Sequence, residues 1–311
     1  MTKHPLLLLV FNRYRETMQV FEAIRKAQPS KLYIASDGPR PGVSGEKQTV
    51  EVIRNHVIGR IDWPCDVKTR FLDANLGCRN AVSSAIDWLF EHEDAGVILE
   101  DDCVPKQSFF DYADEMLDRF RFDERVGMIV GTNLYPVKSQ RTLTQAFFSK
   151  HYPVWGWATW KRAWDGYDVN MKSYDKLRFR DIRYQSPNLV IAMHMKQKFD
   201  RIKKDRMDTW DIQWVFHCWK NSRLAVAPSF NMVTNIGEQG VHTPGRKRSD
   251  HHRESLDIAS GSSWEMSVPY TVPDSEYDMR IFRRRVYFSV LKTMARRMWV
   301  TIVGVFGAYR K

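Results

Sequence analysis

The chain has 311 residues, of which 43% are hydrophobic and 13% aromatic, and its formal net charge is +11. This length allows a sizeable core, and the basic charge favours an anionic partner such as a phosphorylated ligand, a nucleic acid or an anionic membrane. The four cysteines show no CxxC spacing, which argues against a disulfide framework and favours a reducing compartment. We expect neither a secretory signal nor a membrane-spanning helix, because the apolar runs are too short.

Strand and helix patterns alternate through the first half of the chain. Apolar runs predict strands at 6–11, 31–36, 67–72, 97–99 and 127–130, and amphipathic stretches between them predict helices at 16–26, 47–57, 79–90 and 108–120. Such alternation is typical of an α/β fold with a mostly parallel sheet flanked by helices. The second half is less regular: it has the aromatic run YPVWGWATWKRAW (152–164), a predicted helix near 208–219 and a glycine-bearing loop at 235–243.

Polar side chains follow each of the first four predicted strands. They are Asn12 and Arg13, then Asp37, then Asp73 and Asn75, and finally the triplet Glu100, Asp101 and Asp102. In open α/β sheets ligands bind beyond the carboxyl ends of the strands, so these groups predict a binding site at one edge. The glycine patterns of ordinary dinucleotide and P-loop sites are absent.

The triplet at residues 100–102 requires a positive counterpart, because adjacent carboxylates repel one another and are costly to bury unpaired. A hard divalent cation held by these oxygens would bridge a diphosphate and neutralise a leaving group. The alternative is that the acids pair with arginine or cap the helix that begins near Ser108. The other strand-end groups favour the metal-diphosphate interpretation.

The segment ILEDDCVPKQSFFDY resembles the acidic metal-binding motif of GT-A glycosyltransferases. It is similar in particular to that of the N-acetylglucosaminyltransferase that initiates complex N-glycans and to segments of bacterial family-two-like sugar transferases. The resemblance continues in order through VFNR, IASDGPR, WGWATWKRAW and WDIQW, and it covers about residues 5–243. It implies a GT-A-like, Rossmann-like fold and a divalent metal, Mn²⁺ or Mg²⁺.

The resemblance also implies roles for individual residues. Asp102 would ligate the metal, and Glu100 and Asp101 would contact the donor ribose or sugar or support the metal through water. Apart from the resemblance, His242 lies in the glycine-bearing loop, which is suited to folding over a diphosphate, and it would ligate the metal or donate to phosphate; the alternative is an exposed loop histidine. The resemblance further assigns Asp37 to the uracil of a UDP-sugar, Asn12 and Arg13 to the nucleotide pocket, and Arg79 to base or phosphate; the alternative for the two arginines is surface solvation. The aromatic run itself suggests that Trp157 stacks on a sugar, and the alternative for this ring is a place in the core.

Asp211, in TWDIQW, matches the position of the family's catalytic base. An inverting transfer needs a carboxylate that removes a proton from the acceptor hydroxyl as that oxygen attacks the anomeric carbon. Asp208 is the rival, three residues away and expected on the same helical face. The alternative for Asp211 is a helix-capping role.

Residues 279–311 carry nine Lys and Arg and no acid. Their apolar residues keep helical spacing, which indicates a basic amphipathic helix at an anionic membrane surface; the alternative is a helix packed on the domain. We therefore divide the chain into a GT-A-like domain (1–243), a polar mobile segment or linker (244–278) and this tail (279–311). No nucleic-acid-binding motif is recognisable.

The sequence thus predicts a metal-dependent, inverting hexosyl- or N-acetylhexosaminyltransferase. It would use a UDP-sugar and a glycan or lipid-linked glycan acceptor, as in polysaccharide biosynthesis, at the cytoplasmic face of the membrane. Two alternatives are a nucleotidyltransferase, which would release pyrophosphate, and a non-catalytic glycan- or membrane-binding module with a degenerate site.

Overall fold

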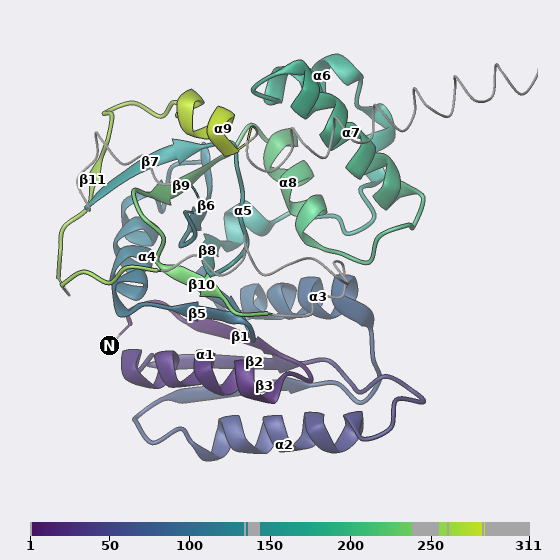
Figure 1. Cartoon of the computed structure of the whole chain (residues 1–311), viewed down its shortest axis with the longest axis vertical. Coiled ribbons are helices and arrows are strands. Elements are labelled where there is room, and N and C mark those ends of the chain that lie inside the picture. Colours follow the sequence, from purple (N-terminus) through teal and green to yellow (C-terminus); the bar gives the residue numbers. More distant parts are fainter. Residues whose placement is uncertain are drawn as a thin grey trace, which may run out of the picture.

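The computed structural model describes residues 2–133, 135, 144–237, 255–259, 261–281 and 283. Its centre is a nine-stranded sheet of order β11-β7-β9-β6-β8-β4-β1-β2-β3 (Figure 1). The strands are β1 (Leu6–Val10), β2 (Lys31–Ser36), β3 (Asp66–Phe71), β4 (Ala95–Glu100), β6 (Val126–Val130), β7 (Gln145–Ser149), β8 (Trp157–Trp160), β9 (Leu224–Pro228) and β11 (Glu265–Met266).

The sheet is mostly parallel. The pairs β1–β2, β1–β4, β2–β3, β6–β9 and β7–β11 are parallel, whereas β4–β8, β6–β8 and β7–β9 are antiparallel. The predicted α/β class with a mostly parallel, helix-flanked sheet is therefore confirmed. A separate two-stranded ribbon joins β5 (Cys103–Pro105) to β10 (Val233–Asn235) in antiparallel register.

The helices of the first half lie where the sequence predicts them. They are α1 (Tyr14–Ala27), α2 (Glu46–Gly59), α3 (Gly77–His92) and α4 (Gln107–Arg119). The second half adds α5 (Lys161–Trp164), a 3-10 helix η1 (Lys172–Lys176), α6 (Phe179–Gln185), α7 (Leu189–Lys203), α8 (Asp211–Lys220) and α9 (Ser275–Ile281). Helices α6 and α7 lie at the end of the molecule opposite α2 (Figure 1). Among the described helices, none combines the length and the apolar character that crossing a bilayer requires.

The central strands read as continuous apolar runs because both of their faces are covered. All five residues of β1 are buried, as are the first five residues of β4. By contrast β3 lies at the edge of the sheet, and its residues are half-buried or exposed. This difference is what a sheet with helices on its faces predicts for central and edge positions.

The aromatic run of the second half forms a central strand, which the sequence pattern did not indicate. Strand β8 inserts antiparallel between β4 and β6, and the rings of Trp157 and Trp160 are buried. Gly156, just before β8, has φ +65°. A Cβ at this position would lie 2.6 Å from Cγ2 of Val233, so the glycine permits both the backbone conformation and the close packing of β10.

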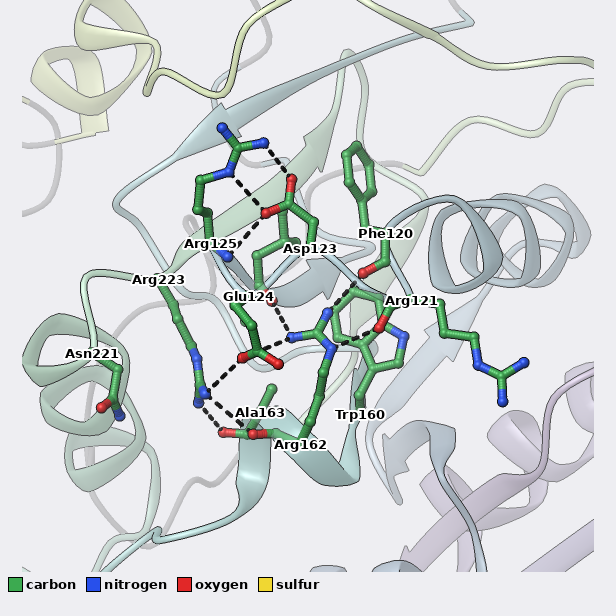
Figure 2. Close-up of polar contacts among 12 residues, drawn as sticks. Phe120, Arg121, Asp123, Glu124, Arg125, Trp160, Arg162, Ala163, Asn221 and Arg223 are labelled. Atoms are coloured by element: carbon green, nitrogen blue, oxygen red, sulfur yellow. Dashed lines mark hydrogen bonds and ion pairs between the residues drawn. The ribbon is translucent and has the colours of Figure 1, made fainter.

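Two largely buried arginines join elements at the start of β6 (Figure 2). Arg162 donates to the carbonyl oxygens of Phe120, Arg121 and Val126 at 2.7, 2.7 and 3.0 Å. Arg223 donates to the carbonyl oxygen of Ala163 at 2.7 Å and pairs with Glu124 at 3.3 Å. Because the guanidinium groups bind carbonyls of the chain itself, this cluster is a structural joint between α4, α5, β6 and β9.

Part of the predicted linker packs onto the sheet. Strand β11 pairs with β7, and Trp264 beside it is buried. Helix α9 crosses the predicted boundary at 278, and the buried Asp278 accepts hydrogen bonds from Oγ of Ser149 at 2.5 Å and from the backbone N–H of Lys150 at 3.1 Å. The boundaries at 243 and 278 themselves stay predictions, and most of the predicted tail lies outside the described residues.

Candidate active site

The carboxyl ends of four neighbouring parallel strands meet at one edge of the sheet. Strands β4, β1, β2 and β3 are adjacent in that order and run in the same direction. The polar groups that follow them are therefore brought to one edge, as the sequence predicts. The functional question is which of these groups remain available to a ligand.

The acidic triplet at the end of β4 is paired with an arginine from the end of β1. A terminal nitrogen of Arg13 lies 3.2 Å from Oδ1 of Asp101, and its other terminal nitrogen contacts Oδ2 of Asp102. The side chains of the two aspartates are only 5% and 11% exposed, and that of Arg13 is 30% exposed. The structure thus contains the arginine pairing that the sequence analysis gave as the alternative to a metal site.

One guanidinium does not neutralise three carboxylates. Burial raises the pKa of Glu100, and the negative charges of Asp102, Asp101 and Asp211 raise it further, although Arg13 opposes them. Burial likewise raises the pKa of Asp101 despite Arg13. Within the described structure Oδ2 of Asp101 is buried without a hydrogen-bond partner. The raised pKa values mean that Glu100 and Asp101 hold their protons more readily than usual, and a further cation would favour their ionised forms.

The ribbon of β5 and β10 places residues 235–237 against Asp102. The backbone N–H of Ile236 donates to the carbonyl oxygen of Asp102 at 2.8 Å, and the side-chain amide of Asn235 donates to Oδ1 of Asp102 at 3.1 Å. A Cβ at Gly237 would lie only 2.4 Å from Oδ2 of Asp102 and 3.1 Å from Arg13. The chain therefore needs glycine at 237 to approach the carboxylate this closely.

Asp37 is engaged by the loop that precedes α3. Its Oδ1 accepts from the backbone N–H groups of Gly38 and Leu76, both at 2.8 Å. Its Oδ2 accepts from the side-chain amide of Asn75 at 2.9 Å and from the N–H of Gly77 at 3.1 Å. These bonds use the four acceptor positions of a carboxylate, so a contact with uracil would require one of them to be released.

Asn12 and Arg79 also have partners within the chain. The side-chain amide of Asn12 donates to Oε1 of Glu46 at 2.8 Å. Arg79 pairs with Asp205 at 2.8 Å and donates to the carbonyl oxygen of Met207. Arg79 therefore anchors the segment before α8 to the start of α3, whereas Arg13 is the predicted donor-binding arginine that touches the acidic triplet.

The structure separates the two candidates for the catalytic base. Asp208 caps α3: its Oδ2 accepts from the N–H of Cys78 at 3.1 Å and its Oδ1 from the N–H of Arg79 at 3.0 Å. Asp211 begins α8 and accepts a hydrogen bond from the hydroxyl of Thr209. Its charge acts on Glu100, so it lies within electrostatic reach of the triplet.

Trp157 belongs to a buried aromatic cluster. Its ring is 0% exposed, and it stacks on Trp210 with 5.6 Å between ring centroids and packs against Trp164 and Trp214. In this structure the ring presents no surface to a donor sugar. The cluster instead fixes the start of α8, and with it Asp211, against the centre of the sheet.

The described residues include no group of three or more His, Cys, Asp and Glu side chains arranged as metal ligands. The triplet nevertheless fits a cation that takes one or two protein carboxylates and completes its shell with phosphate oxygens and water, as Mg²⁺ commonly does. The buried unpartnered oxygen of Asp101 and the presence of three carboxyl groups beside a single guanidinium both support this fit. The other predicted ligand, His242, lies outside the described residues.

Three contributors to this site were not predicted individually. Asn235 and Gly237 position the carboxylate of Asp102, and the buried Glu46 links Asn12 to Arg40, whose backbone N–H donates to it at 2.7 Å. The glycine-bearing loop at 235–243 was the available signal for the first two. Nothing in the local sequence distinguishes Glu46 from an ordinary acid in the first turn of a helix.

No protein-family model matches the chain, and no curated protein matches its sequence. Among solved structures it is similar to a mannosyltransferase from Pyrobaculum calidifontis in complex with GDP-mannose and Mn²⁺, at 12% identity and a TM-score of 0.35, over 53% of this chain and 47% of that one. It is also similar to a UDP-glucose pyrophosphorylase complexed with UDP-glucose, at 9% identity and a TM-score of 0.34, over 74% of this chain and 91% of that one. A third similar structure is the glycosyltransferase GlyE of Streptococcus pneumoniae, at 10% identity and a TM-score of 0.33, over 72% of this chain and 45% of that one. Similarities this low establish neither the activity nor the substrate of this chain.

Proposed function

We propose that the protein is a metal-dependent glycosyltransferase that transfers a hexose or N-acetylhexosamine from a nucleotide-sugar, with UDP as the expected nucleotide. The observation that carries the proposal is the charge imbalance at the end of β4. Three acids, two of them buried, face one arginine at the edge where ligands of α/β sheets bind. An enzyme that binds a diphosphate through a divalent cation needs such an imbalance.

Asp102 and Asp101 would hold Mn²⁺ or Mg²⁺, whose chemistry is to neutralise the charge of the diphosphate leaving group. Arg13 lies between these two carboxylates and would donate to the donor phosphates once a cation shares their charge. Asn235 holds Asp102 in place from the opposite side. The Gly237 loop would exclude water from the same point.

Asp211 is our candidate for the general base. It would take the proton of the acceptor hydroxyl while that oxygen forms a bond to the anomeric carbon and the bond from this carbon to the diphosphate breaks, which inverts the configuration. The bond from the Thr209 hydroxyl orients its carboxylate. Asp208 is the less suitable base, because both of its carboxylate oxygens already accept hydrogen bonds from N–H groups at the start of α3.

The acceptor we propose is a glycan or a lipid-linked glycan, and the proposed location is the cytoplasmic face of a membrane. These proposals rest on the basic, amphipathic sequence of 279–311, most of which lies outside the described residues. The proposals for the acceptor and the location are therefore additions to the proposed reaction and are not used as support for it.

The experiment is a screen of nucleotide-sugars with and without Mn²⁺, in which the released products are identified. We expect a nucleoside diphosphate and a turnover that falls about a hundredfold or more in Asp211→Asn. Asp208→Asn is the matched control and should retain turnover. In a parallel incubation with nucleoside triphosphates and sugar phosphates, release of pyrophosphate would instead show a nucleotidyltransferase.

Calorimetry with UDP and Mn²⁺ tests the metal separately from the reaction. Asp102→Asn should keep the fold but lose most metal-dependent UDP binding, because a ligand charge is removed where the diphosphate is most negative. Sugar transfer that does not depend on a divalent cation would overturn the metal-dependent mechanism. If there is no sugar transfer and UDP binding does not depend on a divalent cation, a non-catalytic module becomes the better interpretation.

A further inference from the structure

The segment that holds η1, α6 and α7 is strongly basic, in addition to the basic residues 279–311. Residues 172–206, called here the α6–α7 surface, contain eleven Lys and Arg against four Asp and no Glu, an excess of seven in a chain whose net charge is +11. This surface is remote from the acidic triplet in sequence. Helices α6 and α7 lie at the end of the molecule opposite α2 (Figure 1), and the residues after α7 reach the start of α3, where Asp205 pairs with Arg79. Nothing in the proposed reaction requires this charge.

The four acids of this surface already have partners. Asp175 pairs with Lys203 at 2.9 Å, Asp200 with Lys196 at 2.8 Å, and Asp205 with Arg79 at 2.8 Å. Asp181 lies within 3.5 and 3.6 Å of two neighbouring arginines. The acids therefore offer little repulsion to an anionic partner, and the remaining basic side chains set the sign of the surface.

Large apolar side chains are exposed among these bases. The exposed fractions are 37% for Phe179, 81% for Tyr184, 51% for Leu189 and 39% for Met193. Two of them lie on α6 and two on α7, and these helices contact each other. Isolated exposed apolar residues are common, but four within fifteen residues of a strongly basic segment form an amphipathic surface.

The periodicity of α7 separates its two sides. Ala192, Met195, Phe199 and Ile202 are buried and face the protein. Leu189, Met193, Gln197 and Arg201 follow at intervals of four, which places them together on the other side of the helix. Apolar groups thus occupy the first half of this outer side, and bases, including the exposed Lys204 just beyond the helix, occupy its end.

We propose that the α6–α7 surface docks on an anionic membrane. Exposed Leu, Met, Phe and Tyr side chains surrounded by Lys and Arg match the interface of a bilayer, where the apolar groups enter the headgroup region and the bases bind anionic lipids. A nucleic acid or a dissolved anionic glycan would satisfy the charge but would leave the aliphatic groups without a partner. The docking does not rest on the proposed reaction, and it is separate from the predicted attachment through 279–311.

The test locates the contact by lysine acetylation of the full chain, read by mass spectrometry, with and without vesicles. On phosphatidylserine-containing vesicles we expect acetylation of the exposed Lys176 and Lys204 to fall about fivefold or more, and to stay unchanged on pure phosphatidylcholine. The exposed Lys26 and Lys47, on α1 and α2, serve as internal controls. Because the readout is residue by residue, binding through the tail alone leaves Lys176 and Lys204 reactive and overturns the proposal.

Paired variants test the charge and the apolar groups. Arg201→Glu with Lys204→Glu should weaken vesicle binding about tenfold or more, whereas Lys26→Glu with Lys47→Glu, with the same change of net charge, should have little effect. Leu189→Ser with Met193→Ser should weaken the binding that remains at high salt, since salt screens only the charge contribution. Equal binding by the two charge variants, or protection of the same lysines by heparin but not by vesicles, would overturn the proposal.

Discussion

Replacing Arg13 by methionine should destabilise the protein more than the loss of an ordinary ion pair. The substitution keeps an unbranched chain of similar reach but removes the positive charge that contacts Asp101 and Asp102. The two carboxylates are nearly buried, so water cannot replace the guanidinium as it would at the surface. Arg25→Met is the control, because Arg25 pairs with Asp62 and both side chains are about half exposed.

The expected loss follows from these exposures. Removing one partner of a buried ion pair costs about 3–5 kcal/mol. The side chain of Arg13 is 30% exposed, which lowers the expectation to about 2–3 kcal/mol because solvent already screens part of the pair. The control should lose less than about 1 kcal/mol, the usual range for surface pairs.

Urea denaturation with a chelator present measures the loss of unfolding free energy in Arg13→Met and in Arg25→Met. Repeating the titrations with Mn²⁺ tests whether the larger loss comes from the unpaired carboxylates. In the wild type Arg13 occupies Oδ2 of Asp102, so a cation must compete with it. In Arg13→Met this competition is gone, and Mn²⁺ should stabilise the variant more than the wild type. The reasoning is refuted if the loss does not exceed that of Arg25→Met or if Mn²⁺ stabilises both proteins equally.

Three other predictions concern single side chains. Asp208→Ala should lower the free energy of unfolding by about 1 kcal/mol in urea titrations, because α3 loses two capping bonds. Gly237→Ala should lower it by about 1–3 kcal/mol and weaken Mn²⁺-dependent UDP binding in calorimetry, because its Cβ would meet the carboxylate of Asp102; unchanged binding would contradict this. Burial raises the pKa of Asp278 to about 6, so as the pH falls from 7 to 4.5 the folded protein binds a proton that the unfolded chain does not. Over this fall in pH, the free energy of unfolding of the wild type should rise by about 2 kcal/mol relative to that of Asp278→Asn. Parallel pH profiles of the two proteins would refute the assignment.

The elements that could be predicted are those whose secondary structure is indicated by the hydrophobic pattern of their own residues. Strands β1, β2 and β4 are runs of buried apolar residues, and the helices between them are amphipathic, so each pattern follows from its own environment. Strand β8 could not be predicted this way, because the run around Trp157 is equally compatible with a core cluster in any secondary structure. Its place is set by pairing with β4 and β6, far away in sequence.

In the candidate site too, some features follow from the local sequence and others depend on contacts between distant segments. The approach of the strand-end groups follows from parallel topology, so the meeting of Arg13 with Asp101 and Asp102 was within reach of the sequence. The commitment of Asp208 to α3 was not, because the bonds span about 130 residues and depend on how the segment before α8 crosses the start of α3. The same holds for Gly237, whose proximity to Asp102 arises from the pairing of β10 with β5.

The position of β8 has a consequence for the order in which the protein can be built during synthesis. Strand β4 is made long before its neighbour β8, and β6 is also complete before residues 157–160 leave the ribosome. Until then β4 and β6 each present an open edge of unpaired backbone groups, and open edges recruit other chains. A nascent or truncated chain that stops before residue 157 therefore exposes the edges of β4 and β6 that face each other across the position of β8. The short segment WATW pairs with both of these edges, and the other edge of β6 stays open until β9 is made.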